Sequence, residues 1–217
     1  MAQARPGGLP ECIDELSQAQ DDLVACEADL TQAQNDLAAC EAELFKKVFV
    51  TSEIFTANLG GISGADDKCN DAAAAAGLPG TYKAWISDSS TSPSISFTRF
   101  TQPYVLVDAS NTRIADNWTD LTTCDEGSDQ CLDNPINVDE NGTVLSDPVD
   151  SNRPVWTNTL TDGAVDETDT DLNCNNFNSG VGSLALAGDY ASTIFRWTER
   201  FLSLSCGLEA RLYCFEQ

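Results

Sequence analysis

Leucine recurs at every seventh residue near the start of the chain, and this repeat constrains the fold more than any other feature of the sequence. The positions are Leu16, Leu23, Leu30, Leu37 and Leu44. Alanine or cysteine follows the first four leucines by three residues, at Ala19, Cys26, Ala33 and Cys40. Spacings of three and four residues put these side chains on one side of a helix. The repeat therefore predicts a helix over residues 11–45, with leucine at heptad position a and alanine or cysteine at d.

A helix with so narrow an apolar stripe must bury it against another surface. We expect a parallel coiled coil between copies of the chain, that is, a homo-oligomer whose interface holds the five leucines. The alternative is a helix that lies along its own domain, which the regularity of the stripe disfavours. Residues 1–10 are rich in glycine and proline, and we expect them to be disordered.

Cys12, Cys26 and Cys40 share position d and lie fourteen residues apart. The segment from Glu11 to Leu44 contains no lysine or arginine, so its acidic side chains repel each other across an interface between copies. We expect interchain disulfides at the three cysteines to offset this repulsion. A dimer can pair all three, whereas a symmetric trimer leaves one over. Leucine at a does not by itself favour dimers, so the number of chains stays open.

Charge and composition exclude several classes of function. A net charge of −24 makes nucleic acid and anionic membrane surfaces poor partners, although adaptation to salty water would also produce it. The chain has no histidine, which removes histidine-dependent catalysis and histidine-bound zinc. We therefore expect no enzymatic activity. The enzymatic alternative is a glycosidase that uses two carboxylates, but no pair is singled out by spacing.

Nine cysteines indicate an oxidising compartment, so we expect a secreted protein, extracellular or at the cell surface. The sequence has no run of about 18 apolar residues. We therefore expect no insertion into a membrane.

A strand, a glycine-rich turn, a helix and a second strand follow the heptads, over residues 47–88. Val48, Val50 and Ile54 indicate the first strand, and three glycines between residues 60 and 64 allow a sharp turn. Ser63, Asp66 and Asp67 supply oxygens and negative charge suited to a helix N-terminus. The alanines of residues 72–76 favour the helix, which ends at the Gly and Pro of residues 77–79.

This block resembles the endostatin domain of certain collagens. The similar motifs are GGISGADDKC (60–69), AGLPGTYKAWIS (76–87), VW (155–156) with DG (162–163), NCNNF (173–177), and Cys206 with LYCFE (212–216). The chain is more similar still to a family of bacterial extracellular domains of unassigned function. The resemblance implies an α+β, C-type-lectin-like domain over residues 46–217. Endostatin's histidine-bound zinc and basic heparin-binding surface are not expected, because the histidines are absent and basic residues are few.

By the same resemblance, Cys69 pairs with Cys214, and Cys174 pairs with Cys206. Cys124 and Cys131 have no counterpart in endostatin, and we expect them to pair locally, holding the shape of a short loop. The alternative for these six cysteines is metal binding, which the absence of a Cys-x-x-Cys pair disfavours.

Carboxylates crowd the region between residues 120 and 171, where periodicity disappears, as in the variable loops of lectin-like folds. Its best candidate for a metal site is a calcium site made of Asp162, Asp166, Asp169 and Asp171. The run does not match the EF-hand pattern, and the simpler interpretation is a solvated acidic loop. No cofactor is required by any motif.

Two functions compete on these grounds. The first is an extracellular, multivalent binding or adhesion module, which displays lectin-like heads on a disulfide-linked stalk and binds a glycan or a cell-surface protein. The second is a structural subunit of an extracellular fibre or surface assembly.

Overall fold

The computed structural model describes residues 8–124, 130–146, 153–165, 173–182 and 184–217. The chain divides into two compact units, Met1–Glu43 and Leu44–Gln217, and we call the second unit the head. Helices and sheets both contribute, which confirms the α+β class. Within the described ranges, no helix combines the length and the apolar character needed to cross a bilayer.

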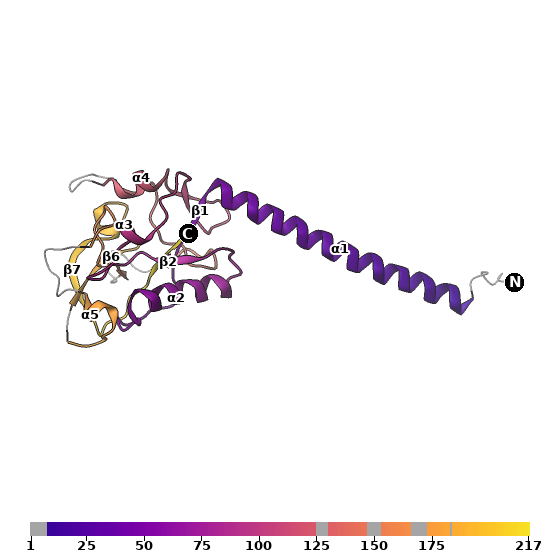
Figure 1. The fold of residues 1–217 in the computed structure, drawn as a ribbon, viewed down its shortest axis with the longest axis horizontal. Coiled ribbons are helices and arrows are strands. Elements are labelled where there is room, and N and C mark those ends of the chain that lie inside the picture. Colours follow the sequence, from indigo (N-terminus) through magenta and orange to yellow (C-terminus); the bar gives the residue numbers. More distant parts are fainter. Residues whose placement is uncertain (1–7, 125–129, 147–152, 166–172, 183) are drawn as a thin grey trace. The chain divides into compact units, whose positions relative to one another are not determined.

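The described part of the first unit is the helix α1 (Leu9–Leu44), which has 36 residues (Figure 1). Its side chains are solvent-exposed wherever they are described. Its sequence is rich in strong helix formers and has no glycine, and no proline after Pro10. At about 1.5 Å per residue the helix is roughly 54 Å long. Leu9 and Pro10 were expected in a disordered segment, but they form the first turn. Proline is tolerated there because the first N–H groups of a helix have no partner in any case.

The head is built on a five-stranded sheet in the order β2-β8-β1-β3-β4. The central strand β1 pairs antiparallel with β8 and parallel with β3. The first and last strands of the head are therefore neighbours, which ties its two ends together. The strands are β1 (Lys46–Val50), β2 (Tyr82–Ala84), β3 (Tyr104–Leu106), β4 (Arg113–Ala115) and β8 (Tyr213–Glu216).

A second, antiparallel sheet of three strands has the order β5-β6-β7. Its strands are β5 (Pro154–Trp156), β6 (Leu184–Asp189) and β7 (Arg200–Ser205). β5 lies inside the segment that the sequence led us to expect as irregular loop, so that expectation was wrong for these residues. Val155 also forms a parallel bridge with Arg211, which links β5 to the chain just before β8.

Helix α2 (Gly61–Ala75) packs against β2 and follows a turn that only glycine allows. A Cβ on Gly64 would lie 2.1 Å from the backbone oxygen of Leu59. The helix begins earlier than expected, at Gly61, after a left-handed Gly60 with no side-chain cap. Asp66 is therefore not a capping residue. Its carboxylate accepts a hydrogen bond from the N–H of Ala84 at 2.8 Å and so fastens α2 to β2.

Two clusters of buried side chains cover opposite faces of the five-stranded sheet. Phe49 belongs to the cluster beneath α2, and its neighbours Val48 and Val50 belong to the other. The second cluster is rich in aromatic rings, including Trp85 and Trp197, whose centroids are 5.0 Å apart. The short helices beside the sheets are α3 (Pro93–Ser96), α4 (Trp118–Thr122), α5 (Cys174–Phe177) and the 3-10 helix η1 (Phe195–Trp197).

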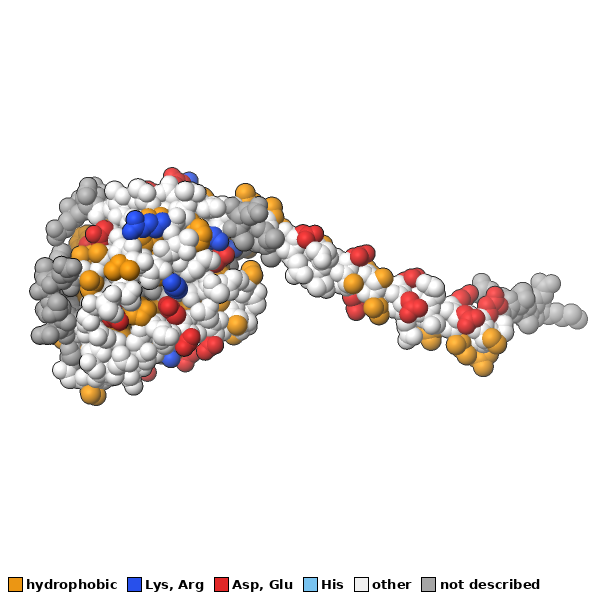
Figure 2. All heavy atoms as spheres, viewed as in Figure 1, with side chains coloured by type: hydrophobic (Ala, Val, Ile, Leu, Met, Phe, Trp, Pro, Cys, Tyr) orange, Lys and Arg blue, Asp and Glu red, His pale blue; other side chains and the backbone are white. Residues whose placement is uncertain are grey.

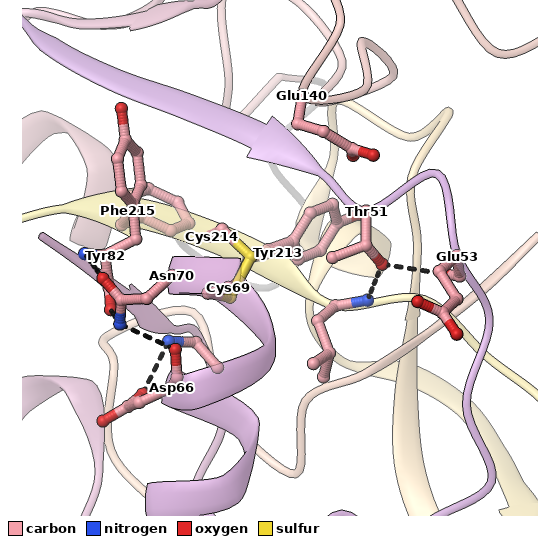
Figure 3. Close-up of a disulfide and its surroundings, with 12 residues drawn as sticks. Thr51, Glu53, Asp66, Cys69, Asn70, Tyr82, Glu140, Tyr213, Cys214 and Phe215 are labelled. Atoms are coloured by element: carbon pink, nitrogen blue, oxygen red, sulfur yellow. Dashed lines mark hydrogen bonds between the residues drawn. A yellow bond between two sulfur atoms is a disulfide. The ribbon is translucent and has the colours of Figure 1, made fainter. Parts of the chain in front are cut away.

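Three disulfides join the six cysteines of the head. The pairs are Cys69–Cys214, Cys124–Cys131 and Cys174–Cys206. These are the pairs that the resemblance and the local spacing suggested. Cys69–Cys214 links α2 to β8 through the first core cluster (Figure 3). Of the residues that Cys124 and Cys131 enclose, 125–129 lie outside the described part of the chain.

Candidate functional site

The most distinctive surface of the molecule is the apolar seam of α1, by which we mean its a and d positions. The five leucines at a are 60–61% exposed. Figure 2 shows hydrophobic side chains recurring along the helix between acidic ones. A leucine side chain contributes about 1.5–3 kcal/mol when it is fully buried, so five exposed leucines are a substantial unrealised gain. The seam therefore has the properties of an interface that a single chain leaves uncovered.

The seam also carries every cysteine that has no disulfide partner within the chain. Cys12, Cys26 and Cys40 are exposed and free in one copy of the chain. All three occupy position d, and alanine occupies the d positions between them. A thiol on the contact line of a coiled coil meets the same layer of the neighbouring helix. In a parallel coiled coil the three cysteines would therefore face cysteines of the neighbouring helix.

Acidic residues line one edge of the seam without interruption. Position g holds Glu15, Asp22, Asp29, Asp36 and Glu43. Position e on the other edge is mixed and holds Ile13, Gln20, Glu27, Gln34 and Glu41. Because the two edges differ, the electrostatic cost of bringing two copies together depends on which edges meet.

On the head, a hollow of about 320 Å³ lies between the segment after β1, one side of α2, and Glu140. Glu53, Asp71 and Glu140 contribute carboxylates to its wall, against the single ammonium of Lys68. Glu140 is 9% exposed and accepts hydrogen bonds from the backbone N–H of Ser52, at 2.8 Å, and from the Ser52 hydroxyl. Figure 3 shows Glu53 and Glu140 on either side of Thr51.

The apolar part of the hollow comes from Phe55 and from two alanines of α2, Ala72 and Ala75. The Lys68 ammonium lies 5.1 Å from the centroid of the Phe55 ring, within the range of a cation–π contact. A surplus of carboxylates beside small apolar side chains suits a positively charged group on a short apolar stem. This site could not be predicted from the sequence, since its residues come from three separate segments with no shared motif.

Asp66 is a half-buried carboxylate close to the Cys69–Cys214 disulfide (Figure 3). Burial raises its pKa above the ordinary value of 3.8, and the nearby Asp67 adds to the effect. The hydrogen bond from Ala84 and the charge of Lys83 act in the opposite direction without reversing it. Ionisation of Asp66 therefore costs free energy in the folded state, and the hydrogen bond from Ala84 of β2 offsets part of this cost.

The expected calcium site is described only at its first residue. The Asp162 carboxylate accepts a hydrogen bond from the N–H of Ala164 at 2.8 Å and so closes its own turn. Asp166, Asp169 and Asp171 lie outside the described residues. Within the ranges that are described, no cluster of three or more carboxylate, thiol or imidazole groups is arranged to hold a metal ion.

The segment labelled α5 is a left-handed turn beside the Cys174–Cys206 disulfide, and it is a second feature that sequence reasoning missed. Four successive residues without glycine, Cys174 to Phe177, have φ between 52° and 56°. Asparagine adopts this conformation more readily than most residues, whereas phenylalanine does so rarely. The Asn173 side chain stabilises the turn by accepting a hydrogen bond from the N–H of Asn176 at 2.9 Å. The run of asparagines around Cys174 was the signal available in the sequence.

Comparison with known proteins adds no family to this account. Neither the protein-family models nor the curated proteins that were searched gave a match to the chain.

Proposed function

We propose that this chain is an extracellular binding module in which copies of α1 associate and thereby display several heads together. The observation that carries the proposal is the exposed seam, with leucine at every a position and all of the unpaired cysteines at d. Such a seam is costly to leave in water and is buried when helices of the same kind associate. Association multiplies weak contacts made by single heads into a strong one.

Secretion is part of the proposal and is supported by the disulfides of the head. Three bonds within one domain are typical of proteins that fold in an oxidising compartment. The same compartment would allow thiols on α1 to become oxidised.

For the head we propose a C-type-lectin-like fold of the endostatin type. Three features support it: the motifs quoted above, the antiparallel pairing of β1 with β8, and the disulfides Cys69–Cys214 and Cys174–Cys206. Fold alone does not define a ligand. Glycans and cell-surface proteins are the ligand classes that we propose, and the hollow beside Glu140 is the described surface best suited to contact a basic group on one of them.

Binding measured with and without association of α1 tests the proposal. The variant Leu23→Glu/Leu30→Glu, with Cys12, Cys26 and Cys40 changed to serine, should be a single chain. The matched control places glutamate one residue further along, as Val24→Glu/Thr31→Glu, because these side chains are exposed but lie off the seam. Arrays of glycans and of immobilised cell-surface proteins should retain the wild type and the control. They should bind the single-chain variant at least about 100-fold more weakly.

Equal binding by all three proteins would contradict the proposal, as would binding by none of them. A chelator added to the same arrays tests the calcium site, which predicts loss of wild-type binding. Electron microscopy of the unbound protein separates the structural alternative, since ordered filaments would favour a fibre subunit and dispersed particles a binding module.

A further inference from the structure

We propose that two copies of α1 pair in parallel and in register, so that Cys12, Cys26 and Cys40 each form a disulfide with the same residue of the other copy. This inference rests on the self-association proposed above, gives a reason for its parallel direction, and adds its alignment and the number of chains. It depends on which residues meet in each arrangement of two seams.

In a parallel pair in register, every layer of the seam contains two identical residues. Leucine meets leucine at each a layer, and cysteine meets cysteine at three d layers. A shift by one heptad would instead set cysteines opposite Ala19 or Ala33, which occupy the intervening d positions, or carry them beyond the overlap of the two helices, so no two cysteines would meet. A shift by two heptads would shorten the overlap and leave cysteines unpaired at the ends.

An antiparallel pair cannot join the cysteines and bury the leucines at once. If Cys26 meets Cys26 of the second copy, then Leu23 lies opposite Asp29, and Leu30 lies opposite Asp22. The same mismatch of a with the acidic g positions follows from any antiparallel alignment that opposes two of the cysteines. The antiparallel alignment that buries the leucines sets each of them opposite cysteine or alanine, for instance Leu30 opposite Cys26. No disulfide can then form.

The charges beside the seam favour the same direction. In a parallel pair, each g residue faces position e of the next heptad in the other helix. Asp22 then meets Glu27, but Asp29 meets the neutral Gln34. In an antiparallel pair g faces g, and every such contact joins two acidic residues. An in-register parallel pair therefore has four contacts between acidic residues, whereas the antiparallel pair has five along the g edge alone.

The small residues at d favour two chains over three or more. A core shared by more helices is wider, and layers of alanine would leave it unfilled. Disulfides require Cα atoms roughly 4.4–6.8 Å apart, which a narrow two-helix seam suits best. Two chains also use all three cysteines, whereas three chains leave one thiol in each layer.

Formation of each bond requires an oxidant with a disulfide of its own, either a small-molecule disulfide or an oxidoreductase. One S–S bond forms between the two chains, the oxidant's S–S bond is reduced to two thiols, and the protons of the cysteine thiols pass to the products. Oxidised glutathione can serve as this oxidant in solution.

Full-length variants that keep a single seam cysteine test the alignment. In each, the other two of Cys12, Cys26 and Cys40 are changed to serine, and the protein is oxidised with glutathione disulfide. Non-reducing electrophoresis should show each of the three variants as a two-chain band that collapses to one chain on reduction. The control is Ala28→Cys in a chain with all three replaced by serine. Because Ala28 lies at the outward f position, this variant should form no cross-link and should run as a single-chain band.

Mass spectrometry of the oxidised wild type locates the bonds. Cleavage after glutamate separates the cysteines, because Glu15 and Glu27 lie between them. The inference predicts peptides that join each cysteine to the same cysteine of the other copy.

Linkage of Cys12 to Cys40, with only the Cys26 variant cross-linked, would show an antiparallel pair. A mass of three chains would contradict the two-chain assembly. Either of these results would leave the multivalent module standing. A single-chain mass for the wild type, with no cross-link in any variant, would end both proposals.

Discussion

Gly188 lies where two backbone segments touch, in β6 beside the end of η1. A Cβ at this position would lie 2.0 Å from the backbone oxygen of Trp197 and 2.9 Å from its carbonyl carbon. Because neither segment can move without disturbing the second core cluster, Gly188→Ala should lower the free energy of unfolding by about 3 kcal/mol or more. Chemical denaturation followed by tryptophan fluorescence measures this. Gly180→Ala is the control, since its Cβ would lie 3.5 Å from Thr56 and should change stability little. Equal stability of the two variants would contradict the close approach.

Asp66 provides a prediction about pH. Its pKa is raised in the fold, so ionisation costs the folded state more than the unfolded one, and the cost appears as pH rises above 3.8. Asp66→Asn keeps an oxygen to accept from Ala84 and removes that cost. The variant should therefore be more stable than the wild type at pH 7, with the difference vanishing below about pH 3.8. Urea titrations at several pH values measure it, with Asp67→Asn as a control for lost charge. A wild type that is more stable at pH 7 would refute the assignment.

Among the elements of the head, α2 and β8 are fixed to each other by a disulfide that spans most of the domain. Cys69 and Cys214 are 145 residues apart, whereas Cys124 and Cys131 are 7 apart. Loop-closure entropy predicts a loss of about 5 kcal/mol when the long link is removed and about 2 kcal/mol for the short one. Thermal unfolding of Cys69→Ala/Cys214→Ala and of Cys124→Ala/Cys131→Ala compares them. A larger loss for the second variant would show that the short link has a greater structural role than its span implies.

Association of α1 should depend on salt when the cysteines are absent. With all three changed to serine, a parallel pair retains four contacts between acidic side chains, from Asp22 with Glu27 and Asp36 with Glu41 in both directions. At about 0.4 kcal/mol each, these contacts cost roughly 1.5 kcal/mol, so screening them should tighten association about tenfold. Sedimentation equilibrium in low and in molar sodium chloride measures the change. Weaker association at high salt would mean that attraction between charges holds the helices together.

Long or strongly patterned elements could be predicted from the sequence, and short ones could not. The heptads of α1 extend over many turns, and α2 is bounded by glycine and proline, so each pattern is repeated enough to identify a helix. β5 is three residues long, too short for an alternating pattern, and its pairing with β6 is made across a long stretch of sequence. The left-handed turn at Cys174 is likewise short, and the asparagines that favour it were its only signal in the sequence. The hollow beside Glu140 was missed because it exists only once distant segments are packed.

At the scale of the whole molecule, the two units differ in whether they bury their apolar residues. The head encloses its tryptophans in two clusters and joins all six of its cysteines to one another. α1 leaves its leucines and its three cysteines in solvent. The head is therefore complete as a single copy, whereas the seam of the first unit is exposed and is the surface that we propose another chain covers.

The mass of the full-length protein in solution, measured by light scattering together with a count of free thiols, tests this claim most directly. At micromolar concentration and without reductant, the account predicts the mass of two chains and no reactive thiol at Cys12, Cys26 or Cys40. Reductant should restore three thiols per chain. The mass of one chain, 23.3 kDa, with all three thiols reactive from the outset, would contradict the account.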